Sequence, residues 1–183
     1  MKILIVVDMQ NDFINGALGT PEARAIVPNV IKKVEQYRND PKGFIIYTAD
    51  THHENYLETQ EGRNLPVPHC IHPSKGWMIP EEIYTLHAPI IMKNTFGAEN
   101  LINYLPSIER ICEKDKGPIE SIEFVGLCTD ICVISNVMIA KSCCPEVPIT
   151  VISSCCAGVT PESHANALRA MEMCQINIVE EVF

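Results

Sequence analysis

The chain has 183 residues, of which 46% are hydrophobic and 20% are charged, and this fits one soluble globular domain over residues 1–183. The net charge is −9 and the Lys and Arg residues are scattered, so no basic stripe could meet a phosphate backbone, and we expect no nucleic-acid partner. No apolar run reaches the ~18 residues that span a bilayer and no export signal is evident, so we expect no membrane partner and a cytoplasmic location.

Nine cysteines are many for this length, and the number is odd. Secreted disulfide scaffolds usually have fewer than ~100 residues and a signal peptide. Several of the cysteines lie in apolar stretches, where a free thiol in a reducing cell behaves as a small hydrophobic group. No Cys-x-x-Cys spacing occurs, which argues against a zinc ribbon.

Short apolar segments rich in β-branched residues alternate with segments of helical spacing along the chain. The predicted strands are Lys2–Val7, Phe44–Ala49, Pro89–Lys93, Ser121–Gly126, Pro148–Ser153 and Ile176–Val179. The predicted helices run from Thr20 to Tyr37, Ala98 to Leu105, Asp130 to Lys141 and Thr160 to about Cys174. A long polar region from Asp50 to Pro89 separates the second and third strands, and a loop of this length is usually functional or partly structured.

This alternation predicts an α/β three-layer sandwich with a mostly parallel six-stranded sheet. Ligands bind beyond the carboxyl ends of the strands in such sheets. Asp8, Asp50 and Lys93 end the first three strands, and Cys132 follows the fourth at a helix start. We therefore expect these four side chains to meet at one edge of the sheet.

Cys132 is the candidate nucleophile. Gly126 permits a sharp turn off the strand, and the helix that follows would direct its amides and positive dipole end toward the thiol. This setting predicts a lowered thiol pKa and amides that could bind an oxyanion. The alternative, a buried structural cysteine, would be the better guess from the residue type alone.

Asp8 and Lys93 are the candidate proton-transfer groups beside this thiol. A desolvated carboxylate next to a thiol and a lysine could move protons in both directions. The alternatives are a turn cap for Asp8 and a surface lysine for Lys93.

Asp50 and His52, with His69 returning from the long loop, form a candidate metal site. Carboxylate and imidazole ligands without sulfur suit Zn, Fe or Mn. The alternative is a polar loop whose histidines only make hydrogen bonds.

The motifs together resemble the isochorismatase-like cysteine hydrolases, in particular their nicotinamidase/pyrazinamidase branch, over nearly the whole chain. The matching segments are Asp8–Phe13, Asp50–His52 with Pro68–Cys70, Gly126–Val133 and Thr160–His164 with Ala167 and Leu168. The resemblance implies strand order 3-2-1-4-5-6, a homo-oligomer and a cis peptide bond between Leu127 and Cys128. It also implies a catalytic triad of Asp8, Lys93 and Cys132, and an oxyanion hole made by the amides of Cys128 and Cys132.

The activity implied is hydrolysis of a small carboxamide to an acid and ammonia through a Cys132 thioester, with a small-molecule amide as the substrate. Phe13 would form one wall of the substrate pocket. Glu61 is the candidate fourth ligand of a divalent metal, because Thr59–Gly62 resembles the place where some nicotinamidases carry a Glu; zinc is favoured, with Fe or Mn as alternatives. The aromatic residue usual before the Pro-x-His is replaced by Leu65, which leaves the substrate open.

Three alternatives remain open. The chain could be another isochorismatase-family hydrolase with a different substrate. It could be a thiol redox or sensor protein, since Cys128 lies four residues before Cys132. It could also be a non-catalytic scaffold, although the intact Asp8, Lys93 and Cys132 argue against this.

Overall fold

A six-stranded parallel sheet forms the centre of the protein in a computed structural model that describes all 183 residues. The strand order is β3-β2-β1-β4-β5-β6, and every neighbouring pair is parallel. This confirms the predicted fold class and order. The strands are β1 (Lys2–Val7), β2 (Gly43–Asp50), β3 (Ile90–Lys93), β4 (Ser121–Leu127), β5 (Ile149–Ala157) and β6 (Asn177–Val179).

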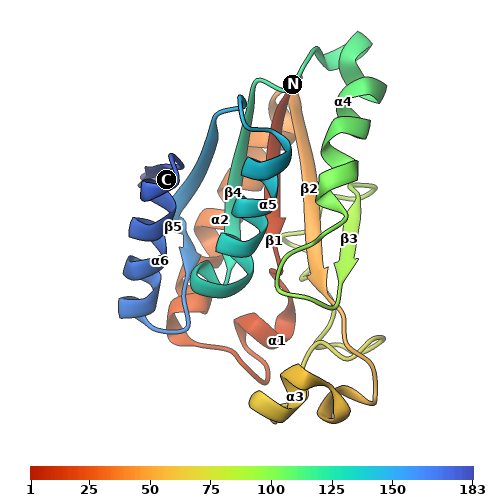
Figure 1. Cartoon of the computed structure of the whole chain (residues 1–183), viewed down its shortest axis with the longest axis vertical. Helices are drawn as coiled ribbons and strands as arrows, with labels where there is room; N and C mark the ends of the chain where they lie inside the picture. The colour runs from red at the N-terminus through yellow and green to blue at the C-terminus, as the bar shows by residue number, and fades with distance from the viewer.

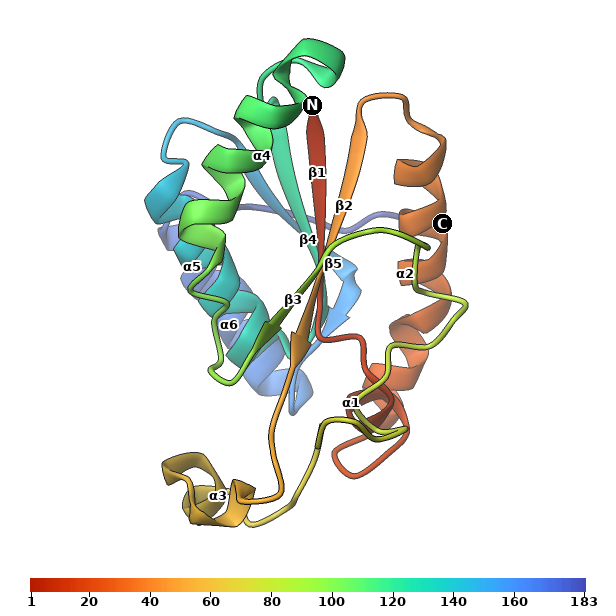
Figure 2. The ribbon, with the colours of Figure 1, turned by 90° about the vertical axis from the view of Figure 1, so that its right-hand side faces the viewer.

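Helices cover both faces of this sheet, as Figure 1 and Figure 2 show. The longest, α2 (Pro21–Asn39), lies on one face, while α4 (Leu101–Lys116), α5 (Ile134–Cys143) and α6 (Pro161–Met173) lie on the other (Figure 2). Short elements surround the carboxyl ends of the strands: α1 (Asn11–Ile14), the 3₁₀ turn Tyr56–Glu58, α3 (Gln60–Asn64) and the π-helical turn Thr129–Val133. No helix is long and apolar enough to cross a membrane.

The two layers of the core follow from the alternation of side chains along the central strands. In β1, Ile3, Ile5 and Val7 pack toward α4 and α5, while Leu4 and Val6 pack toward α2. All five side chains are fully buried, which is why this strand reads as a continuous apolar run.

The largest differences from the predicted boundaries occur in three elements. The helix expected over 98–105 extends to Lys116, because Pro106 removes a single backbone donor near its start and does not end it. The helix expected from Asp130 begins instead with the π-helical turn Thr129–Val133. Strand β5 continues to Ala157, since Cys155 and Cys156 are buried members of the strand.

Candidate functional site

The carboxyl ends of β1 and β3 and the turn after β4 bring Asp8, Lys93 and Cys132 into contact. The Lys93 ammonium lies 2.7 Å from the Asp8 carboxylate and 3.5 Å from the Cys132 thiol. Thr48, on β2 between them, donates a 2.6 Å hydrogen bond to the other carboxylate oxygen of Asp8. Asp8 itself has φ 47°, in the left-handed region that an aspartate tolerates better than most residues.

Burial and the charges of neighbouring groups together shift the pKa values of these three side chains. It raises the pKa of the Asp8 carboxyl, against the opposing charge of Lys93. Burial alone would lower the pKa of Lys93, but the charges of Asp8, Cys132 and Asp50 outweigh it, so this pKa is raised and the ammonium form is kept. Burial, followed by the negative charge of Asp8, raises the pKa of Cys132 well above its usual value.

The expected lowering of the Cys132 pKa is therefore wrong. Helix amides favour a thiolate, but burial removes the water around this thiol, and desolvation disfavours any charged form. The structure therefore places an Asp8–Lys93 ion pair beside a thiol whose raised pKa favours the neutral form.

The turn that carries Cys132 depends on a close approach of two backbones. Gly126, at φ 120°, precedes the turn, and a Cβ there would lie 2.1 Å from the carbonyl oxygen of Val7. The Leu127–Cys128 peptide bond is cis, as the resemblance implied. The Cys128 carbonyl then accepts hydrogen bonds from the amides of Ile131 and Val133, the second of which closes the π-helical turn.

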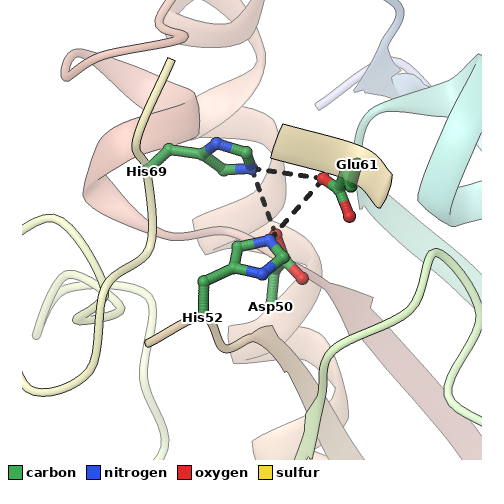
Figure 3. Close-up of side chains that lie close together, drawn as sticks. All are labelled: Asp50, His52, Glu61 and His69. Atoms are coloured by element: carbon green, nitrogen blue, oxygen red, sulfur yellow. Dashed lines mark ion pairs between the residues drawn. The ribbon is translucent and has the colours of Figure 1, made fainter. Parts of the chain in front are cut away.

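Next to this group lies a second cluster, made of Asp50, His52, Glu61 and His69, whose ligand atoms all lie within 4.8 Å of one another. The Nε2 atom of His52 is 3.0 Å from the Asp50 carboxylate and 3.6 Å from that of Glu61. Figure 3 shows the two imidazole rings and the two carboxylates turned toward a common centre. The other oxygen of Asp50 lies 3.6 Å from the Lys93 ammonium, so this carboxylate joins the two clusters.

The donor set fits a divalent metal ion. The Nε2 atom of His52 is buried and has no hydrogen-bond partner, which is costly unless something else occupies its lone pair. The Nδ1 atom of His69 is paired with the Val67 carbonyl 2.8 Å away, so its Nε2 atom faces the centre. The nearby imidazoles of His52 and His69 and the charge of Lys93 outweigh burial and hold the pKa of Asp50 below its ordinary value, which favours the ionised carboxylate.

A mostly apolar cavity of about 320 Å³ opens between the two clusters. Cys132 lies in its wall beside Cys128, and three metal-site residues, Asp50, Glu61 and His69, line it as well. Its apolar walls are Phe13, Leu18, Leu65, Phe96, Ile131 and Val159. A small flat molecule in this cavity would contact the thiol and the metal-type cluster together.

The structure thus brings together all the residues singled out in the sequence, including Phe13 and Glu61. Sequence reasoning missed Phe96, because an aromatic residue in a loop after a strand carries no periodic signal. It also missed Gln10, whose side-chain amide donates to the Asp50 carbonyl at 2.8 Å and accepts from the Asp50 amide at 2.7 Å. A glutamine two residues after the strand-end Asp8 was the available signal.

Tyr56 was missed as well. Its ring packs against both metal-site imidazoles, with centroids 4.7 Å from His52 and 5.1 Å from His69. Trp77 is not among the residues that line the cavity, and its indole donates to the hydroxyl of Thr51 at 2.9 Å, so it packs within the long loop.

Solved structures of other proteins have the same fold. The pyrazinamidase of Pyrococcus horikoshii, solved in complex with zinc, superposes with a TM-score of 0.79 at 27% identity, covering 98% of this chain and 99% of that one. The nicotinamidase/pyrazinamidase of Bacillus subtilis has a TM-score of 0.80 at 22% identity, over 98% and 99% of the two chains. An N-carbamoylsarcosine amidase from Thermoplasma acidophilum has a TM-score of 0.77 at 23% identity, over 99% and 98%.

No curated protein sequence gives a significant match to the chain. The model of the isochorismatase domain, in contrast, matches residues 2–180, which is almost the entire sequence. The chain therefore belongs to the isochorismatase family of hydrolases.

Proposed function

We propose that the protein is a cysteine amidohydrolase that cleaves a small carboxamide to its acid and ammonia through a thioester on Cys132. The observation that carries the proposal is the contact of Lys93 with both Asp8 and Cys132 at the wall of an apolar cavity. A carboxylate, an ammonium and a thiol in contact are the parts that a covalent acyl transfer needs.

The first half of the reaction makes the thioester. Asp8 accepts the Cys132 proton. Lys93 stabilises the Asp8 carboxylate before this transfer and the Cys132 thiolate after it. The thiolate attacks the amide carbonyl, whose oxygen is bound by the amides of Cys128 and Cys132. The C–N bond then breaks, and the proton held by Asp8 goes to the leaving nitrogen, which departs as ammonia.

The second half releases the acid. Asp8, again a carboxylate, takes a proton from water, and the hydroxide attacks the thioester carbonyl. The C–S bond breaks, the proton returns to the sulfur, and the free thiol is restored. The raised pKa of Asp8 assists both halves, because it brings the proton affinity of this carboxylate nearer to that of the groups with which it exchanges protons.

Asp50, His52, His69 and Glu61 would hold a divalent metal ion, with zinc as the first candidate. When bound, this ion supplies a Lewis acid that orients the substrate or polarises a water molecule. The pyrazinamidase of Pyrococcus horikoshii, at 27% identity, was solved with zinc, which supports this choice.

Nicotinamide is the first substrate to try. Phe13 and Phe96 both line the cavity, so an aromatic wall is available although Leu65 replaces the expected one. A ring contact is worth about 1 kcal/mol, so losing one would weaken binding rather than forbid it. The aliphatic walls Leu18, Ile131 and Val159 would also accept a branched aliphatic amide.

The experiment is ammonia release by zinc-loaded protein from three amides: nicotinamide, benzamide and isobutyramide. Benzamide has the same ring without the pyridine nitrogen, so a preference for nicotinamide over benzamide would support contact of that nitrogen with the metal. A preference for isobutyramide would replace nicotinamide as the substrate while keeping the amidohydrolase. Release at background from all three, and from a wider amide panel, would contradict the proposed reaction.

A thiol sensor is less well supported. Redox-sensing cysteines are accessible and have low pKa values. Burial instead raises the pKa of Cys132 well above its usual value and that of Cys128 to about 12.

A further inference from the structure

The turn that carries Cys132 is tied to the start of helix α6 by side chains that the proposed reaction does not use. The hydroxyl of Thr129, the first residue of the turn, lies 2.8 Å from Nδ1 of His164. The carboxylate of Asp130, the next residue, accepts from the amide of Val159 at 3.1 and 3.2 Å. Two adjacent residues of the nucleophile turn are therefore fixed to the segment that leads into α6.

His164 is itself held firmly. It lies in the first turn of α6, where its amide donates to the carbonyl of the N-cap Thr160 at 2.9 Å. The side chain of Ser163 completes a capping box with Thr160, which fixes this end of the helix. A Cβ at Gly158 would lie 2.9 Å from the backbone and Cβ of His164, so the loop before the helix packs directly on this residue.

The turn that carries Cys132 is a single π-helical turn, closed by the 3.0 Å bond from the Val133 amide to the Cys128 carbonyl. Turns of this kind are rare and are frequently found at functional sites. Thr129 is fully buried, so its hydroxyl has no water to replace His164. Loss of the imidazole would leave that hydroxyl unpaired three residues before the nucleophile.

We propose that His164 is a positioning residue for Cys132, acting through the Thr129 hydroxyl on the nucleophile turn. The proposal rests on the proposed function, since it concerns the geometry of that thiol toward Asp8 and Lys93. His164 neither lines the cavity nor belongs to the two clusters, so its effect on Cys132 passes through the turn. Burial lowers the pKa of His164, against the charge of Asp130, which favours the neutral imidazole in this contact.

Two matched pairs of variants test the contact itself. The side-chain amide of asparagine reaches the place of Nδ1, whereas that of glutamine lies one bond farther, so His164→Asn keeps the contact and His164→Gln loses it. Likewise Thr129→Ser keeps the hydroxyl, and Thr129→Val removes it at nearly constant volume. The second pair answers the question if substitution of His164 prevents folding, and thermal unfolding shows which variants fold.

The first readout is the kinetics of amide hydrolysis. Displacement of a reacting group by about 1 Å can cost about 100-fold in rate, so His164→Gln and Thr129→Val should each lower kcat by about 10- to 100-fold. KM should stay nearly constant, because the cavity walls are untouched. His164→Asn and Thr129→Ser should keep most of the wild-type kcat, and the double variant Thr129→Val/His164→Gln should be no worse than either single change.

The second readout is the rate at which iodoacetamide alkylates Cys132, followed on its own peptide by mass spectrometry. The alkylation rate should fall in His164→Gln and Thr129→Val and stay near the wild-type value in His164→Asn and Thr129→Ser. This measurement requires no amide substrate. If no amide is hydrolysed by the wild-type protein, the proposed function fails while the alkylation rates still test the contact. Equal kcat and equal alkylation rates for asparagine and glutamine at position 164, or fully additive losses in the double variant, would overturn the positioning role.

Discussion

Asp8 is the residue on which both halves of the proposed amide hydrolysis depend. Its carboxylate is fully buried, contacts Lys93 and accepts from Thr48, so no water can take over its proton transfer. We predict that Asp8→Asn lowers kcat/KM by about 100- to 10,000-fold, because an amide of the same shape cannot accept the thiol proton. Steady-state ammonia release measures this, with the exposed Asp115→Asn as the control that should retain wild-type activity.

Near-normal turnover by Asp8→Asn would mean that another group accepts the Cys132 proton. Asp50 would then be the next carboxylate to test, since its second oxygen lies 3.6 Å from Lys93.

Glu61 tests the metal site at the level of a single ligand. It is the second residue of α3, whose start is fixed by a 3.0 Å bond from the Gly62 amide to the Thr59 hydroxyl, and its carboxylate lies 3.6 Å from His52 Nε2. We predict that Glu61→Gln weakens zinc affinity by about 10-fold or more, measured by competition with a chelating dye. The exposed Glu58→Gln, from the neighbouring 3₁₀ turn, should bind zinc as the wild type does. Equal affinity of the two variants would remove Glu61 from the ligand set.

Among the elements, helix α2 and the C-terminal segment are joined by one buried lysine. The ammonium of Lys33 lies 2.6 Å from Glu123 on β4 and 2.7 Å from Glu181 beyond β6. We predict that Lys33→Met lowers the free energy of unfolding by about 1–3 kcal/mol, because it leaves two partly buried carboxylates without their partner. Urea unfolding measures this, and the exposed neighbour Lys32→Met is the matched control with little change.

This contact also has a pH signature. Burial alone would lower the pKa of Lys33, but the two glutamates outweigh burial and raise it. Because the pKa is raised in the folded state, the Lys33 ion pairs contribute to the free energy of unfolding at neutral pH. This contribution is lost as the pH rises above about 10. The stability difference between the wild type and Lys33→Met should therefore shrink in that alkaline range, and a difference that grows there would contradict the ion-pair account.

The central strands β1, β2, β4 and β5 could be predicted from the sequence because they are largely buried on both faces and so consist mostly of apolar residues. The long helix α4 could not be bounded, since Pro106 looks like a stop when the backbone is unknown. The region between Asp50 and Pro89 could be recognised as polar, but its local structure could not be predicted. Its short turns are fixed by single contacts, such as the hydrogen bond from the Tyr56 hydroxyl to the Leu65 carbonyl.

The site could be predicted further than the loops, and for a simple reason. The carboxyl ends of parallel strands share one edge, so Asp8, Asp50 and Lys93 had to meet there once the order of strands was known. The protonation of Cys132 could not be predicted, because desolvation depends on the complete packing around the thiol. Phe96 and Gln10 were missed because their roles come from contacts across the fold rather than from a pattern along the chain.

For the whole molecule, the metal site should be a source of stability. Four ligands come from the end of β2, from the loop after it and from α3, so a bound ion would fasten these segments to the sheet. A ligand at 100 times its Kd stabilises the folded state by about 2.7 kcal/mol. We predict a rise of about 5–10 °C in Tm when zinc is added to chelator-treated protein, given about 2–4 °C per kcal/mol at this size. His52→Ala should abolish the rise, and a zinc response that survives in this variant would place the ion elsewhere.

Covalent catalysis by Cys132 would leave an acyl group on this residue, and rapid-quench mass spectrometry can detect that group directly. Zinc-loaded protein is mixed with the amide that it turns over best, quenched in acid within the first turnover and digested. We predict the corresponding acyl group on the Cys132 peptide, its release by hydroxylamine as expected for a thioester, and no adduct or turnover in Cys132→Ala. The exposed Cys174→Ala should behave as the wild type does. Wild-type ammonia release by folded Cys132→Ala would contradict the account.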